Sequence, residues 1–388
     1  MGHWPDKYVI GLTGNLAMGK SLVRRMLEHL GAYSLDVGGL AYQAMAPGAP
    51  AYKPAIQMFG LWILDAEKRV DRAKLDAVAF SHPEALRRRE ALTQPLISRA
   101  LDTLIGRARH RVVVVEAIDL LEGYLADKVD AIWVVNASPE NQIARLVSSG
   151  LSEWEARKRI ELQNPQADKL SRATVVIQND GTPEQTWAIV QAEWNRLGAQ
   201  LGFAQAPEEA KTIPVMVPPV AGKLDIKEVA IRRGMPRNAE EIAALLTQLT
   251  GRPHTRMDVM TAFGQKSYML AQADGQNVGI ISFQVENLVT RVDQILVRPD
   301  ALIPAVVTGL IEAVESSSRE LQSEIGFLFL PQNTPKAMLE ILTSLGYTLR
   351  TLEQIKVPAW REAARESQPP NTVIYAKQLR AERVLKPL

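Results

Sequence analysis

Short apolar runs alternate with amphipathic stretches along the first half of the chain. Five runs have the length and composition of buried strands: residues 8–12, 33–37, 111–115, 131–135 and 174–177. Between them, apolar residues recur at helical spacing, most clearly over residues 22–30, 85–108, 138–148, 152–163 and 183–197. Because strands that alternate with helices pair in parallel, the pattern predicts an α/β domain with a three-layer arrangement over residues 1–197.

The second half has a different pattern. Residues 198–224 contain four prolines and many alanines, which predicts a semi-extended linker. Beyond it, strand-like runs occupy residues 228–232, 268–273, 278–285, 291–297, 325–330 and 372–378. Helical patterns occupy residues 239–249, 304–321 and 335–345. A glycine turn at Gly275 joins two of the strands as a hairpin. We therefore predict an α+β domain with a mostly antiparallel sheet over residues 225–388.

Composition supports two folded domains and limits the classes of partner. The 388 residues exceed the roughly 250–300 that one core reaches. With 45 basic and 43 acidic side chains, the net charge of +2 does not favour nucleic acid. The absence of cysteine excludes disulfides and thiolate sites, and the five histidines lack metal-binding spacing. No apolar run reaches 18 residues and no secretory signal opens the chain, so we expect no membrane span and a cytoplasmic location.

One motif predicts a chemical function. Residues 14–21 (GNLAMGKS) match the pattern GxxxxGK[ST] and lie between a predicted strand and a predicted helix. In a P-loop of this kind, backbone N–H groups and the helix N-terminus surround nucleotide phosphates, the lysine neutralises them, and the serine hydroxyl binds Mg²⁺ at Ser21. The predicted nucleotide contacts are Gly14, Asn15, Ala17, Gly19, Lys20, Ser21 and Leu22. A loop that keeps this sequence without binding nucleotide is the open alternative.

Further motifs accompany the P-loop in register over residues 7–197. They include residues 35–41 (LDVGGLA), 46–48 (APG), 70–75 (VDRAKL), 94–97 (QPLI), 151–163 and 169–181. With them, the first half resembles the dephospho-coenzyme A kinase family. The resemblance implies ATP and Mg²⁺ as cofactors and transfer of a phosphoryl group to the ribose 3′-hydroxyl of dephospho-coenzyme A, which completes coenzyme A biosynthesis.

Several positions depart from the pattern of that family. The second aspartate of its D-x-D pair, usually assigned as the base, falls on Gly38, so that only Asp36 remains. Its histidine-proline pair reads Gln94-Pro95. Its acidic segment D-x-P-L-L-x-E matches residues 117–123 (AIDLLEG), which places alanine and glycine at its two acidic ends. The arginine expected before the Gly-Leu-Ser-Glu segment is missing from residues 147–150 (VSSG).

These departures predict impaired catalysis, because each preorganised charge of this kind contributes about 10²–10³ in rate. Two carboxylates remain as candidate replacement bases, Asp36 and Asp119. Both also have a purely structural interpretation: Asp36 as a cap at a strand end, and Asp119 as a solvated loop residue.

The second half is similar in element order to the GNAT acetyltransferases. Residues 276–279 (QNVG), 295–299 (ILVRP) and 333–347 carry this resemblance. In that family a turn of the form [RQ]-x-x-G-x-[GA] binds the pyrophosphate of acetyl-coenzyme A. Residues 302–307 (LIPAVV) stand there, without the arginine or either glycine. Since bulky residues prevent a close backbone approach, we expect no acetyl-coenzyme A binding in the usual mode.

Two kinds of function remain open. The eroded positions in both halves favour a catalytically impaired protein, very slow or without turnover, that acts as a pseudoenzyme that binds ATP or as an assembly subunit. The alternative is an active dephospho-coenzyme A kinase fused to an acyltransferase-like domain. Possible ligands and partners are ATP, dephospho-coenzyme A or coenzyme A, a protein partner, and a second copy of this chain. The intact Gly19-Lys20-Ser21 argues for nucleotide binding over a pure scaffold.

Overall fold

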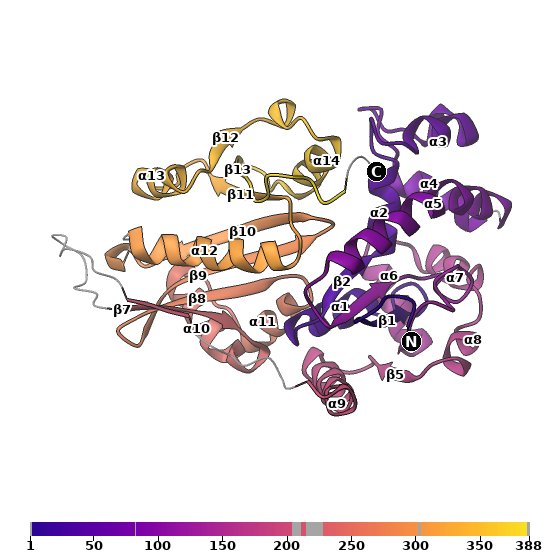
Figure 1. The fold of residues 1–388 in the computed structure, drawn as a ribbon, viewed down its shortest axis with the longest axis horizontal. Helices are drawn as coiled ribbons and strands as arrows, with labels where there is room; N and C mark the ends of the chain where they lie inside the picture. The colour runs from indigo at the N-terminus through magenta and orange to yellow at the C-terminus, as the bar shows by residue number, and fades with distance from the viewer. Residues whose placement is uncertain (1, 82, 204–210, 215–227, 302–303, 386–388) are drawn as a thin grey trace. The chain divides into compact units, whose positions relative to one another are not determined.

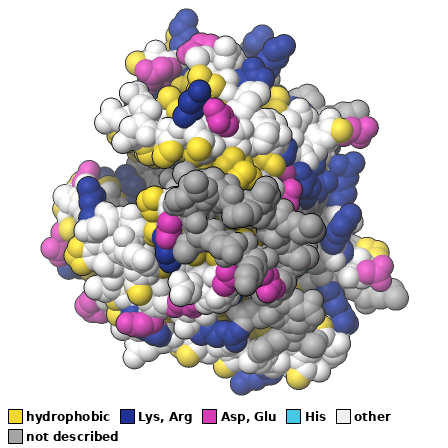
Figure 2. Space-filling view, turned by 90° about the vertical axis from the view of Figure 1, so that its left-hand side faces the viewer, with side chains coloured by type: hydrophobic (Ala, Val, Ile, Leu, Met, Phe, Trp, Pro, Cys, Tyr) yellow, Lys and Arg dark blue, Asp and Glu magenta, His cyan; other side chains and the backbone are white. Residues whose placement is uncertain are grey.

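The computed structural model describes residues 2–81, 83–203, 211–214, 228–301 and 304–385 (Figure 1). The chain divides into two compact units. The first unit comprises Met1–Gln205 together with Val384–Leu388, and the second comprises Ala206–Arg383. None of the described helices is long and apolar enough to cross a membrane. On the face shown in Figure 2, basic and acidic side chains both occur among hydrophobic ones, as the nearly balanced composition implies.

The first unit is built on a five-stranded parallel sheet, as predicted. The sheet has the order β2-β3-β1-β4-β5. Its strands are β1 (Tyr8–Thr13), β2 (Tyr33–Asp36), β3 (Val112–Glu116), β4 (Ala131–Asn136) and β5 (Val175–Gln178). The chain moves from β1 toward one edge and later returns to β4 on the other side. The carboxyl ends of β1, β3 and β4 therefore border the crevice where open α/β sheets bind ligands.

Helices cover the first sheet. Helix α1 (Lys20–His29) packs against α9 (Pro183–Leu201), and their apolar side chains join those of β1, β3 and β4 in one core. Helix α5 (Pro83–Arg107) packs against three shorter helices: α2 (Val37–Ala44), α3 (Tyr52–Phe59) and α4 (Arg72–Ser81). The segment after β4 forms α6 (Pro139–Ser148), α7 (Glu153–Glu161) and α8 (Gln166–Ser171). Ser152 caps α7 in the capping box expected from the sequence.

The second unit contains an eight-stranded sheet that is antiparallel except for the pair β10–β11, as predicted. Its order is β12-β13-β11-β10-β9-β8-β7-β6. The strands are β6 (Lys211–Pro214), β7 (Glu228–Gly234), β8 (Ser267–Ala273), β9 (Gln276–Glu286), β10 (Val289–Val297), β11 (Ile325–Pro331), β12 (Thr348–Arg350) and β13 (Thr372–Gln378).

Helices lie on both faces of this second sheet. Successive side chains along a strand point to opposite faces, and here they pack against different helices. Helices α12 (Pro304–Glu320) and α13 (Lys336–Ser344) share a core with Met269, Ile281 and Leu328. The neighbouring side chains Leu270 and Ile280 pack instead with α10 (Ala239–Thr250) and α11 (Arg256–Phe263). Helix α14 (Pro358–Ser367) covers Phe327 and Phe329.

The unit boundaries differ from the predicted linker at residues 198–224. Helix α9 continues to Leu201 and ends where Gly202 takes a left-handed conformation, with φ of 66°. Residues 211–214, read as linker because of their proline, pair with β7 as the edge strand β6. Proline is tolerated at such an edge. Val384 and Leu385 are buried and belong to the first unit, in which Arg107 Nη1 donates to the carbonyl of Val384 at 3.3 Å.

Candidate active site

The P-loop follows β1 and leads directly into α1. Gly19 precedes the helix in a left-handed conformation, with φ of 98°, and no side chain caps the helix. A Cβ atom at Gly19 would lie 2.0 Å from Asn179 Nδ2, so only glycine fits there. Gly14 has φ of 143° and a similarly close neighbour, the carbonyl oxygen of Val135. The uncapped N–H groups of the first turn of α1 are thus available to an anion.

Two side chains, from α6 and from the residue after β5, stabilise the conformation of the P-loop. Arg145 Nη1 donates to the carbonyls of Ala17 and Met18, each at 3.2 Å. Asn179 Nδ2 also donates to Met18, at 2.9 Å, and Arg145 Nη2 donates to the carbonyl of Asn179. The loop conformation therefore depends on contacts from α6 and the end of β5, and is preorganised for its ligand.

Ser21 binds a carboxylate that the sequence analysis missed, Glu116, which also acts electrostatically on Lys20. Lys20 is buried, its Nζ donates to the carbonyl of Asn15 at 3.1 Å, and burial lowers its pKa against the opposing effect of Glu116. Ser21 Oγ donates to Glu116 Oε1 at 3.0 Å, while Arg24 Nε donates to Glu116 Oε2 at 2.6 Å. The only sequence signal for Glu116 was its place as the acidic end of the run VVVVE.

The chemistry around Ser21 suits Mg²⁺, which takes oxygen ligands and keeps few protein ligands when phosphates are present. The Ser21 hydroxyl and the Glu116 carboxylate supply such oxygens beside the P-loop. Among the described residues, no group of three or more acidic or histidine side chains could hold a metal ion by itself. A magnesium ion here would therefore depend on the nucleotide phosphates for the rest of its coordination.

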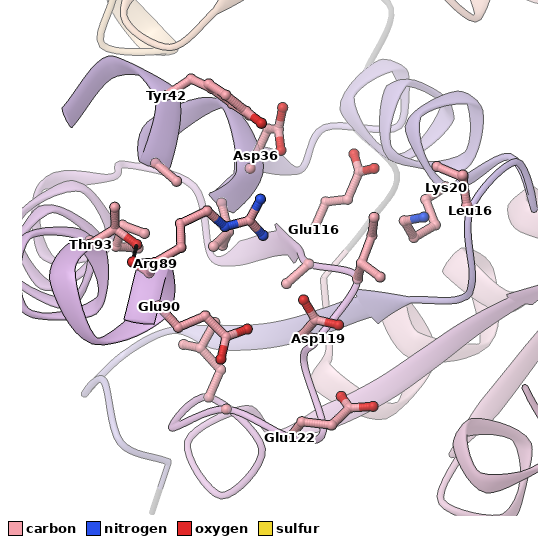
Figure 3. A pocket seen from close by; sticks show the side chains of 18 of the residues that line it. Leu16, Lys20, Asp36, Tyr42, Arg89, Glu90, Thr93, Glu116, Asp119 and Glu122 are labelled. Atoms are coloured by element: carbon pink, nitrogen blue, oxygen red, sulfur yellow. Dashed lines mark hydrogen bonds between the residues drawn. The ribbon is translucent and has the colours of Figure 1, made fainter. Parts of the chain in front are cut away.

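A cavity of about 580 Å³ extends from the P-loop to α2 and α5. Figure 3 shows Leu16 and Lys20 on one side, Tyr42, Arg89 and Thr93 on the other, and the carboxylates of Asp36, Glu116 and Asp119 between them. Gly19, Ala17, Ser21 and Leu22 also line it, whereas Gly14 and Asn15 do not. The structure thus brings both predicted base candidates to one cavity with Lys20.

Three carboxylates from the end of β3 and the segment after it lie in the cavity wall. They are Glu116, Asp119 and Glu122, of which only Asp119 was a predicted site residue. Burial and the neighbouring Glu122 raise the pKa of Asp119, against the effect of Lys169. Lys169 is 2% exposed and its Nζ donates to Glu122 Oε1 at 3.0 Å. Despite its burial, the pKa of Glu122 is held below its usual range by hydrogen bonds from Asn164 and Lys169.

Asp36 lies beside Glu116, since β2 and β3 pair in register at these two residues. The Gly38 position is close to both Asp36 and a cation. A Cβ atom there would lie 3.3 Å from Asp36 Oδ1 and 4.0 Å from Arg72 Nη2. The guanidinium of Arg72 lies 4.5 Å from the ring centroid of Tyr42, and both side chains line the cavity.

In the second unit, two positions of the expected pyrophosphate turn, Leu302 and Ile303, lie outside the described residues. Its last two positions, Val306 and Val307, belong to α12 and are fully buried in its core. Tyr347 is also buried, and burial together with Glu315 raises its pKa far above the usual range. These three side chains therefore serve packing in this unit.

The fold and the site of the first unit define a P-loop nucleotide-binding protein. Its cavity is lined on one side by the P-loop and elsewhere by several carboxylates. A family model for dephospho-CoA kinase matches residues 8–185. The dephospho-CoA kinase of Geobacter metallireducens is 43% identical over 190 residues, which cover 48% of this chain and 94% of that protein. That of Moorella thermoacetica is 36% identical over 206 residues, 52% of this chain and 96% of that protein. The chain belongs to the dephospho-CoA kinase family.

Solved structures match either half of this chain, with lower sequence identity. A dephospho-CoA kinase from Campylobacter jejuni has 20% identity and a TM-score of 0.36, and covers 50% of this chain and 99% of that one. A putative acetyltransferase from Salmonella typhimurium has 11% identity and a TM-score of 0.32, and covers 40% of this chain and 95% of that one.

Proposed function

We propose that the first unit catalyses transfer of the γ-phosphoryl group of ATP to the 3′-hydroxyl of dephospho-coenzyme A. One observation carries this proposal: Lys20 and Ser21 of the P-loop line the same cavity as the carboxylates of Asp36 and Asp119. Membership of the dephospho-CoA kinase family supports it. The predicted loss of catalysis rested on single positions of the sequence and stays a prediction.

The cavity supplies each part that phosphoryl transfer needs. The uncapped start of α1 and Lys20 bind the β- and γ-phosphates, and Ser21 with Glu116 would hold Mg²⁺, which neutralises charge on the phosphates. The acceptor hydroxyl attacks the γ-phosphorus, the bond to the β,γ-bridging oxygen breaks, and ADP leaves. The hydroxyl proton passes to a carboxylate. We assign this role to Asp119, because its raised pKa makes it the stronger base, with Asp36 as the second candidate.

The far side of the cavity suits an anionic acceptor. Arg72 and Arg89 both line it, and the ring of Tyr42 supports the guanidinium of Arg72. A planar guanidinium binds phosphate oxygens through paired hydrogen bonds. We assign these two arginines to the diphosphate of dephospho-coenzyme A.

The test is isothermal titration with Mg-ATP, with and without dephospho-coenzyme A, alongside a phosphoryl-transfer assay. Lys20→Ala serves as the control. Turnover that the substitution abolishes supports the proposal. Binding of ATP without turnover would favour the pseudoenzyme, and no binding would favour the assembly subunit.

The second unit has no assigned reaction. The burial of Val306 and Val307 supports the prediction that it does not bind acetyl-coenzyme A in the usual mode. Titration of the full chain with acetyl-coenzyme A tests this. A protein partner or homo-oligomer and a cytoplasmic location stay predictions, and light scattering of the purified protein checks the oligomeric state.

A further inference from the structure

One side chain connects the P-loop to α7. Gln163 lies in the short segment between α7 and α8. Its Oε1 accepts a hydrogen bond from the backbone N–H of Leu16 at 2.7 Å. Its Nε2 donates to the backbone carbonyl of Arg159 at 3.1 Å. Both ends of the amide are therefore used, one on the loop and one on the last turn of the helix.

Arg159 is the residue at the helical end of this connection. Its side chain is half-buried and lines the cavity together with Leu16, Ala17 and Lys20. Within the described part of the chain, its guanidinium has no hydrogen-bonded acceptor, and it interacts electrostatically with the exposed Glu155. A cation that faces a phosphate-binding loop without a hydrogen-bonded partner is placed to bind a phosphate oxygen.

The core does little to fix Arg159 in place. Ala156 is the single buried residue of α7, and the other side chains of the helix are exposed or half-buried. A helix with so little buried surface has few contacts that set its position to within the fraction of an ångström that catalysis needs. The hydrogen bonds of Gln163 supply such a restraint directly from the P-loop.

We propose that Gln163 is a positioning residue that couples the P-loop to Arg159, so that the Arg159 guanidinium contacts the phosphates of the bound nucleotide. This inference rests on the proposed function of the first unit, since it concerns the same cavity. Arg159 of α7 would then supply a phosphate-binding cation. Residues 147–150, where the resemblance led us to expect an arginine, contain none.

The chain offers a matched control in Gln166. Its Oε1 accepts a hydrogen bond from the backbone N–H of Asn15 at 2.9 Å, so it binds the P-loop backbone as Gln163 does. Its Nε2, however, donates to Val135 and Asn136 at the end of β4 and not to α7. Loss of Gln166 disturbs the loop without uncoupling Arg159.

The test is a double-mutant cycle read by the affinity for Mg-ATP and, separately, by kcat. We expect Arg159→Ala and Gln163→Met each to weaken ATP binding about tenfold, and the double variant to be no weaker than Arg159→Ala alone. The effect of Gln166→Met should instead add to that of Arg159→Ala. Additive effects of Gln163→Met and Arg159→Ala would overturn the proposal.

A milder variant guards against misfolding. Gln163→Glu keeps an acceptor for the Leu16 N–H but has no donor for the Arg159 carbonyl. We expect it to keep the thermal stability of the wild type and to lose ATP affinity as Gln163→Met does. Wild-type affinity in Gln163→Glu would overturn the coupling. Binding without turnover in the wild type would refute the proposed reaction alone, whereas absence of ATP binding would refute both.

Discussion

At the scale of single residues, Asp119 experiences opposing influences. Burial and the carboxylate of Glu122 raise its pKa, and the cations Lys169, Arg89 and Lys20 lower it. The net effect is a rise, so Asp119 takes a proton more readily than an exposed aspartate does. The raised pKa also sets the pH below which Asp119 cannot act as a base, because the carboxyl is protonated as the pH falls through that pKa.

Substitution of Glu122 should shift the pH below which Asp119 is protonated. Glu122→Gln removes a negative neighbour and leaves Lys169 free to act on Asp119, and both changes lower the pKa of Asp119. We expect the acid limb of the pH profile of kcat/KM to move to lower pH. The exposed Glu84, outside the cavity, provides the control Glu84→Gln, for which no movement is expected. An unmoved acid limb in Glu122→Gln would exclude Asp119 as the base.

Direct substitution separates the two base candidates. Asp119→Asn should lower kcat by about 10²–10⁴-fold, and Asp36→Asn by clearly less. Since a raised carboxyl pKa means that stability declines as the pH rises through it, Asp119→Asn should unfold at no lower temperature than the wild type at neutral pH. A larger loss of kcat in Asp36→Asn would transfer the role to Asp36.

Gly19 gives a third residue-scale prediction. In Gly19→Ala the new methyl group would meet Asn179 Nδ2 at 2.0 Å, on a backbone with φ of 98°. The loop must then open, and we expect at least a hundredfold weaker ATP binding by titration. Gly106→Ala in α5, where a Cβ atom would meet nothing within 4 Å, should leave ATP affinity unchanged. Unchanged affinity in Gly19→Ala would mean that the loop does not bind phosphate in this conformation.

At the scale of elements, the first turn of α9 supports the P-loop from behind. Thr182 caps the helix in a capping box with Gln185. One turn later the buried Thr186 Oγ1 donates to Asn179 Oδ1 at 2.8 Å. Asn179 in turn holds the carbonyl of Met18. The helix therefore fixes the rotamer of the side chain that shapes the loop.

Thr186→Val tests this support while keeping the shape of the side chain. It leaves the buried Asn179 Oδ1 without that donor, which costs about 1–3 kcal/mol of unfolding free energy. We expect this loss in denaturant unfolding together with weaker ATP binding. Thr186→Ser, which keeps the hydroxyl, should retain the ATP affinity. A stability loss with unchanged ATP affinity would show that Asn179 keeps its place without α9.

At the scale of the whole molecule, the first unit is assembled from two distant stretches of chain. Val384 and Leu385 are 5% and 6% exposed, and Arg107 of α5 binds the carbonyl of Val384. Helix α5 also contributes Arg89 and Glu90 to the cavity. Contacts made by the last described residues thus stabilise the helix that forms one wall of the site.

A truncation that removes residues 384–388 tests this dependence. Burial of each aliphatic side chain contributes about 1.5–3 kcal/mol, so the first unit should unfold at a clearly lower temperature. Mg-ATP stabilises the unit that binds it, and this shift identifies the transition of the first unit in calorimetry. If the truncation instead lowers the transition that Mg-ATP does not shift, these residues stabilise the second unit.

The parts of this protein that local patterns encode could be predicted from the sequence. The parallel strands, the P-loop and the capping box of α7 each follow from residue spacing within one element. The roles of Glu116 and Gln163 could not, because they depend on β1–β3 pairing and on a contact between residues 147 positions apart. Residues 211–214 were misread because a proline on a sheet edge resembles a linker until its partner strand is known.

The divided first unit also has a consequence for biosynthesis. Translation delivers the five strands of its sheet early, but Val384 and Leu385 arrive only after all of Ala206–Arg383 has been made. A nascent chain on the ribosome therefore carries a first unit in which Arg107 of α5 lacks its hydrogen bond to Val384. Full stability of that unit is reached only once the second unit has been synthesised, so premature termination within the second unit yields an incomplete first unit as well.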